Sequence, residues 1–109
     1  MEESAKQAFG IGASTVVKGR YAFAGGLLTE ASGQSSFAFG EPLNNRNTKA
    51  EDTGSMAVGM GCQAGGPGAI ALGYNTTANG DGAIALGYNT TATANRAVAL
   101  GSNTNARGS

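Results

Sequence analysis

The sequence predicts an all-β protein, a parallel β-solenoid of about seven coils with roughly 14 residues in each. Two observations lead to this fold class. A four-residue motif, apolar-Ala-apolar-Gly, recurs at regular spacing, and its alternation of large and small side chains has the period of two that a strand requires. The chain also contains 19 glycines and 20 alanines among its 109 residues, which is too little side-chain volume for an ordinary globular core.

The first half of each coil is predicted to be a short strand that carries the apolar-Ala-apolar-Gly motif. Its clearest copies end at the evenly spaced glycines Gly59, Gly73, Gly87 and Gly101. Looser copies are assigned to residues 37–40, 21–24 and 7–10, and the copy at 21–24 has alanine in the glycine position. This gives seven copies. The spacing is regular except that the second coil is two positions longer than the others and the third is five positions longer.

The second half of each coil is predicted to be another short strand, with the pattern Thr-x-Ala-x-small. Ile70 and Leu72 of the first strand are expected to point inward and to pack against the threonine and alanine of the second. The copies of this second pattern are residues 29–33, 48–52, 62–66 (with Cys62 in the threonine position), 76–80, 90–94 and 104–108. The turns between the halves end in residue types that tolerate a positive φ angle: Gly12, Gly61, Asn75, Asn89 and Asn103.

The outward side of the first strand is predicted to be an interface between copies of the chain. With Ile70 and Leu72 inside, the alanine of each motif faces outward, and these alanines form a flat apolar column. Because a thin roll buries too little surface to offset its chain entropy, we expect a homo-oligomer packed through this column. The predicted interface residues are Ala8, Ala22, Ala38, Ala57, Ala71, Ala85 and Ala99.

The turn after the first strand is the candidate ligand-facing edge, because the two long coils gain their extra residues there. The second coil has residues 25–28 at this turn and the third has residues 41–47. A stacked tyrosine pair at the same turn either anchors a partner or fills a groove between subunits. Alternatively, the insertion is an extra surface loop that the fold tolerates and that has no role in binding. The candidate residues are Glu41, Pro42, Leu43, Asn44, Asn45, Arg46, Tyr74 and Tyr88.

Composition argues against several classes of function. Seven basic and seven acidic residues cancel without forming a run, so no nucleic-acid partner is expected. No histidine and a single cysteine leave no His-based triad, usual zinc site or internal disulfide, so we expect neither catalysis nor a cofactor. No apolar stretch reaches the roughly 18 residues of a membrane span.

Individual side chains also have simple structural explanations. Cys62 takes a threonine position and is expected to be a buried filler. Asp81 and the pair Glu51–Asp52 lack the closely spaced oxygen ligands of a calcium loop. A glycoside-hydrolysis pair would need Glu41, Glu51 or Asp52, and the two adjacent carboxylates point to opposite faces of a strand. These carboxylates are therefore predicted to be solvated.

The full repeat is apolar-Ala-apolar-Gly, two turn residues, then Thr/Ser-x-Ala-x-Gly. It resembles the head repeat of trimeric autotransporter adhesins, the YadA-like head, over nearly the whole chain. The resemblance implies a left-handed parallel β-roll and a homotrimer. It also implies attachment of a bacterial surface to host extracellular-matrix proteins or to cell-surface glycans or receptors.

The repeat is also compatible with other functions. Similar head repeats occur in phage tail fibres, so a receptor-binding or spacer segment of a virion fibre is an alternative. Ice binding by the threonine column is a further alternative, although the phase of the repeat puts that column inside the roll. The chain stops at Ser109, just before the next motif is due. We therefore expect residues 1–109 to be a single head-repeat domain from a longer fibrous protein, attached to the bacterial surface without inserting into the membrane itself.

Overall fold

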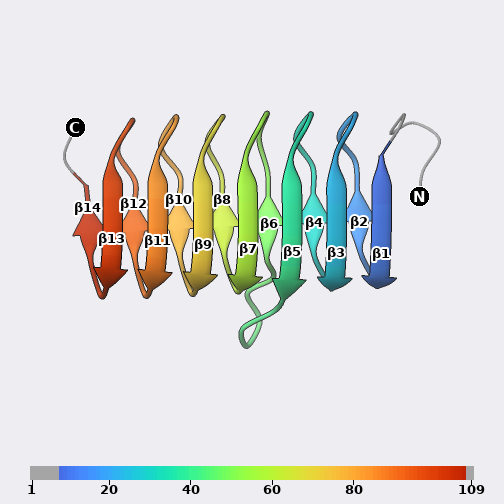
Figure 1. The fold of residues 1–109 in the computed structure, drawn as a ribbon, viewed down its shortest axis with the longest axis horizontal. Helices are drawn as coiled ribbons and strands as arrows, with labels where there is room; N and C mark the ends of the chain where they lie inside the picture. Colours follow the sequence, from blue (N-terminus) through green and yellow to red (C-terminus); the bar gives the residue numbers. More distant parts are fainter. Residues whose placement is uncertain (1–7, 108–109) are drawn as a thin grey trace.

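The computed structural model describes residues 8–107, so Gln7, which begins the first predicted motif, and Gly108, which ends the last, lie outside it. Seven coils stack side by side along one axis (Figure 1), and the molecule extends over 40 × 25 × 16 Å. Each coil has one five-residue strand and one two-residue strand. Among the described residues, no helix is long and apolar enough to cross a membrane.

The long strands form one seven-stranded parallel sheet and the short strands form a second. The long strands are β1 (Phe9–Ala13), β3 (Phe23–Leu27), β5 (Phe37–Glu41), β7 (Met56–Met60), β9 (Ile70–Tyr74), β11 (Ile84–Tyr88) and β13 (Val98–Ser102). The short strands are β2 (Val16–Val17), β4 (Glu30–Ala31), β6 (Lys49–Ala50), β8 (Gln63–Ala64), β10 (Thr77–Ala78), β12 (Thr91–Ala92) and β14 (Asn105–Ala106). Coil 1 is β1 with β2, and coil 7 is β13 with β14. The predicted all-β parallel solenoid of seven coils is confirmed.

The first two coils are shifted by two residues from the predicted alignment. Phe9 pairs with Phe23 and Phe23 with Phe37, so the strand motifs of coils 1 and 2 are residues 9–12 and 23–26. The motif glycines are evenly spaced except across coil 3, and they are Gly12, Gly26, Gly40, Gly59, Gly73, Gly87 and Gly101. Within residues 8–107, only the third coil contains an insertion, and the predicted insertion in the second coil is wrong.

The glycine column explains this shift. Gly12 and Gly26 have φ angles of 116° and 106°, and a Cβ on either would lie 2.0 or 2.1 Å from the carbonyl oxygen of the glycine in the next coil. Alanine cannot take this position, so Ala24 is not the motif residue of coil 2. Gly12 is likewise a strand residue, and Ser14, with a φ of 58°, takes the turn position of coil 1. The other four predicted turn residues do have positive φ, between 58° and 63°.

The long strands face the opposite way from the prediction. Their alanines, such as Ala71 and Ala85, are 0% exposed, and they lie inside the roll against buried residues such as Thr76 and Ala78 of the opposite half. The reason is the thickness of the roll. The whole molecule is only 16 Å across its shortest axis, which leaves little depth for side chains between the two sheets. The interior therefore holds methyl groups and threonines, whereas larger residues such as Leu72 face outward.

Candidate functional site

The outer side of the long-strand sheet carries two rows of large apolar side chains, interrupted at Gly25, and we call this surface the apolar face. Phe9, Phe23 and Phe37 stack along it with ring centroids 5.2 and 4.8 Å apart. Several of its side chains are about half exposed, including Val98 at 54% and Leu100 at 55%. One row is Phe9, Phe23, Phe37, Met56, Ile70, Ile84 and Val98, and the other is Ile11, Gly25, Phe39, Val58, Leu72, Leu86 and Leu100.

The predicted alanine interface is wrong, because these alanines are buried within the single chain. Those of the strands point into the roll, and Ala8 and Ala22 precede their strands as a result of the two-residue shift. None of the seven is more than 4% exposed, so none can meet another chain without unfolding the roll. The buried alanines are Ala8, Ala22, Ala38, Ala57, Ala71, Ala85 and Ala99.

The insertion in coil 3 forms a small hairpin. The Leu43 N–H donates to the Arg46 carbonyl oxygen and the Arg46 N–H donates to that of Leu43, both at 2.9 Å. Asn44, with a φ of 56°, and Asn45 form an exposed tip, and the hairpin extends past the ends of the neighbouring strands (Figure 1). Glu41 at its base is exposed, whereas Pro42, Leu43 and Arg46 are partly buried. The hairpin therefore exposes its tip and its first residue, Glu41, and partly buries the residues between them and the roll.

Arg46 points back onto the roll. Its Nη2 donates to the Thr76 carbonyl oxygen at 3.0 Å and also to Thr77 Oγ1, two coils further on. Burial lowers the pKa of the Arg46 guanidinium, and the Coulombic effect of the nearby Cys62 opposes this shift. Sequence analysis could not reveal this contact, because it joins residues that are 30 and 31 positions apart.

Tyr74 and Tyr88 lie on the same edge as the hairpin. Glu41, Met60 and the two tyrosines occupy consecutive positions of one row that borders the apolar face. The tyrosine rings stack with centroids 4.9 Å apart and planes within 5°. Because each ring covers one face of the other, the pair exposes mainly ring edges and the outer faces of the stack.

An asparagine ladder runs beside the tyrosines. The side-chain amide of Asn75 donates to Asn89 Oδ1, and that of Asn89 donates to Asn103 Oδ1 at 3.1 Å. The equivalent turn position in coil 4 is Gly61, so the ladder stops where the hairpin lies. The structure thus gathers the hairpin, the tyrosines and the ladder on one turn edge.

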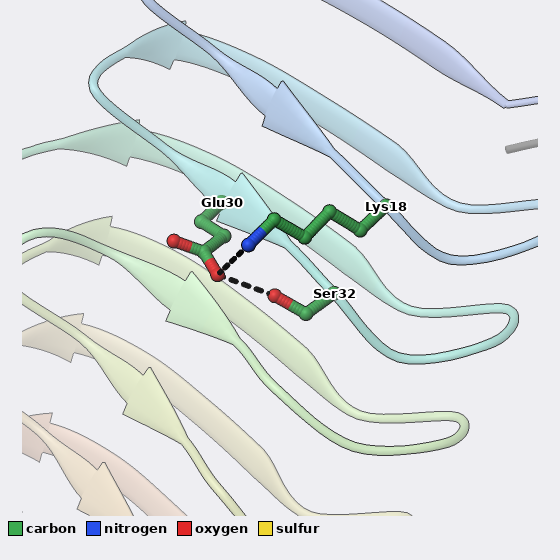
Figure 2. A network of polar contacts seen from close by, with 3 residues as sticks. All are labelled: Lys18, Glu30 and Ser32. Atoms are coloured by element: carbon green, nitrogen blue, oxygen red, sulfur yellow. Dashed lines mark hydrogen bonds and ion pairs between the residues drawn. The ribbon is translucent and has the colours of Figure 1, made fainter. Parts of the chain in front are cut away.

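The outer side of the short-strand sheet is polar. The Glu30 carboxylate accepts a hydrogen bond from Ser32 Oγ at 2.5 Å and forms an ion pair with Lys18 at 4.0 Å (Figure 2). Lys18 is largely exposed, so this pair adds little to stability. Asp52 Oδ1 accepts the Thr53 N–H. Within residues 8–107, no three carboxylate or thiol side chains lie close enough together to hold a metal ion.

Cys62 is fully buried in the threonine position of coil 4, as predicted. Its sulfur lies 3.1 Å from the Gly73 carbonyl oxygen and 3.3 Å from that of Val58. A thiol can donate its proton to only one of them at a time. The side chain therefore fills the interior and is screened from solvent.

The fold and its surfaces together define a parallel β-solenoid with a short, regular coil and one exposed apolar face. It also has one turn edge that carries the hairpin, the tyrosine pair and the asparagine ladder, which we call the decorated turn edge. Comparison with protein-family models then shows which repeat this is. Residues 64–90 and 78–104 each match the YadA head domain repeat, so the chain contains a YadA-like head repeat region. Both matches lie on the C-terminal side of the insertion. No curated protein matches the chain.

Proposed function

We propose that this chain is the attachment head of a trimeric adhesin on a bacterial surface. Three left-handed rolls associate through their apolar faces and present the decorated turn edge to extracellular-matrix proteins or to cell-surface glycans of a host. The match to the YadA head repeat supports the class, and the apolar face supports the assembly. The proposed chain is part of a longer fibrous protein that anchors it to the bacterial surface.

The exposed apolar face is the observation that carries this proposal. Its seven rungs, about 4.8 Å apart, extend over roughly 30 Å, and they present aromatic and aliphatic side chains such as Phe39 and Leu100 at about half exposure. Soluble monomers rarely leave so continuous an apolar surface uncovered, and surfaces of this kind mark interfaces. A second copy of the same chain offers an equally long surface with the same spacing of rungs.

The assembly is tested by placing one charge on each side of the same coil. Leu86→Arg puts a guanidinium on the apolar face, whereas the matched control Thr91→Arg puts it on the polar face of coil 6. Sedimentation velocity should show three-chain particles for the wild type and for Thr91→Arg, and smaller particles for Leu86→Arg. If Leu86→Arg sediments like the wild type, the apolar face is not the interface.

Attachment is tested with the assembled protein on immobilised matrix proteins and on a panel of host glycans. Saturable binding to at least one of them is expected, and it should be lost from the Leu86→Arg chain if attachment requires the assembly. Binding only to bacterial surface glycans would instead support a phage tail fibre. Binding to neither class would refute the attachment role while leaving the assembly result intact.

A further inference from the structure

We propose that Arg46 is a positioning residue that clamps the coil 3 hairpin across the roll and so holds the Asn44–Asn45 tip in one orientation. The role of the tip in attachment rests on the proposed function above. The clamp itself does not, because it is a property of the single chain. The clamp holds the insertion in one conformation, as a recognition loop requires.

The clamp joins coils that are otherwise not in contact. Every strand in the described part of the chain touches only strands of its own coil or of an adjacent coil. The hairpin starts after β5 in coil 3, yet Arg46 Nη2 donates to the Thr76 carbonyl oxygen and to Thr77 Oγ1 in coil 5. The hairpin therefore passes over the turn of coil 4. In a repeat protein stabilised by neighbour contacts alone, this is an additional tie.

Gly61 in coil 4 provides the space for this crossing. A Cβ at Gly61 would lie 2.7 Å from Leu43 Cβ and 3.4 Å from the Arg46 carbonyl oxygen. The backbone does not demand glycine, because Asn75, Asn89 and Asn103 adopt a φ of 58° at the same position, close to the 63° of Gly61. Glycine is therefore required by the hairpin above it, which is evidence for a docked hairpin independent of Arg46.

The base of the hairpin is fixed as well. The Gly61 N–H donates to the Glu41 carbonyl oxygen at 3.0 Å, and the Thr48 hydroxyl lies 3.1 Å from the same oxygen. Both ends of the insertion are thus held, and only the tip projects. A recognition loop held in its binding conformation loses less conformational entropy when it binds.

The Arg46 side chain has the chemistry of a clamp. Its Nε is buried and has no hydrogen-bond partner within residues 8–107, and burial lowers the pKa of the guanidinium. A partly buried charge of this kind persists only with compensation, which the carbonyl of Thr76 and the hydroxyl of Thr77 supply. An incoming ligand would have to break these bonds to reach Nη2.

Hydrogen exchange of the Leu43 and Arg46 backbone amides tests the clamp without any ligand, since these two amides close the hairpin. Arg46→Met keeps an unbranched side chain but removes the charged hydrogen bonds. Such bonds contribute about 1.5–3 kcal/mol, so exchange at both amides should become roughly 10- to 150-fold faster. Arg46→Lys, which keeps a charge but not the planar donor group, should give an intermediate rate.

Gly61→Asn tests the same clamp from the surface on which the hairpin rests. Asparagine can adopt the positive φ of this turn, but its side chain collides with Leu43. It should speed exchange at the two hairpin amides, whereas the matched control Asn103→Gly, in a turn without a hairpin, should not. The Leu86 amide in β11 should stay protected in every variant and so report an intact roll. If Arg46→Met folds and both amides exchange within about twofold of the wild type, the clamp is refuted. If the Leu86 amide of Arg46→Met loses its protection from exchange, the roll of that variant is not intact. The clamp is then refuted if Gly61→Asn folds and its two hairpin amides exchange within about twofold of the wild type.

Binding is measured on the same variants. Faster hairpin exchange with unchanged attachment would show that the clamp exists but that the tip is not used. Normal hairpin protection with no attachment to any tested surface would instead count against the proposed function and leave the clamp standing.

Discussion

Substituting alanine for one glycine of the long strands should be far more damaging than the same change at the last glycine of the series. Gly87 has a φ of 128°, and a Cβ there would lie 1.9 Å from the Gly101 carbonyl oxygen and 3.1 Å from its nitrogen. Gly101 has a similar φ of 112°, but in residues 1–109 taken alone the nearest described atom to its added Cβ is Thr104 Cγ2 at 3.7 Å. The two positions share the backbone conformation and differ in the close contact.

This difference sets the expected magnitudes. Forcing a residue with a side chain into this backbone region costs about 1–3 kcal/mol, and Gly101→Ala should lose that much. At Gly87 the added methyl also collides with the Gly101 carbonyl of β13, the strand that pairs with β11 in the parallel sheet. Overpacking of this kind costs about 1–3 kcal/mol or more. Gly87→Ala should therefore lose roughly 2–6 kcal/mol, enough to threaten folding of a small domain.

Urea unfolding followed by circular dichroism gives both values, provided that all proteins are compared at one chain concentration, since assembly contributes to apparent stability. Gly73→Ala should behave like Gly87→Ala, because its Cβ would lie 2.0 Å from the Gly87 carbonyl oxygen. Equal losses at Gly87 and Gly101 would refute the reasoning, because they would mean that the close approach between coils contributes nothing.

Two further predictions concern the interior and the insertion. Thr48→Val should lower the free energy of unfolding in urea by about 1 kcal/mol, because the Thr48 hydroxyl lies 3.1 Å from the Glu41 and Gly59 carbonyl oxygens. Thr90→Val should be neutral or stabilising, since Thr90 Oγ1 has no partner in the described part of the chain. Equal losses of stability in the two variants would contradict this prediction. Deleting residues 42–46 leaves Glu41 followed by Asn47 and Thr48, as Tyr74 is followed by Asn75 and Thr76 in a coil without an insertion. The shortened protein should therefore fold and sediment like the wild type but attach more weakly. Unchanged attachment would exclude the hairpin from the ligand-facing edge.

Much of the fold can be predicted because it depends on the spacing of residues that are close together in the sequence. The regular recurrence of glycines such as Gly73 and Gly87 is sufficient to predict coils, and Thr76 falls inside the roll as its phase requires. The positive φ angles of Asn75 and Asn89 also follow from residue type alone. The insertion locates the candidate edge, although it does not reveal the contacts that hold the hairpin.

The errors arise where a pattern is compatible with two arrangements. Alternation of Ile70, Ala71 and Leu72 identifies a strand but does not say which side is interior, because either side of an alternating strand can face the core. In coil 2, alanines flank Phe23 on both sides, so residues 21–24 and residues 23–26 each fit all but one position of the motif. The structure selects the one that places Gly26 beneath Gly40.

The sequence by itself determined the all-β repeat, the number of coils, the buried threonines and the turn that carries the insertion, because each depends on residues close together along the chain. Only the tertiary structure decided that the alanines fill the roll, that an apolar face remains exposed on the single chain, and that the hairpin crosses Gly61 so that Arg46 reaches Thr77. These features depend on how closely the two sheets approach and on contacts between separate coils, and no local pattern encodes such distances.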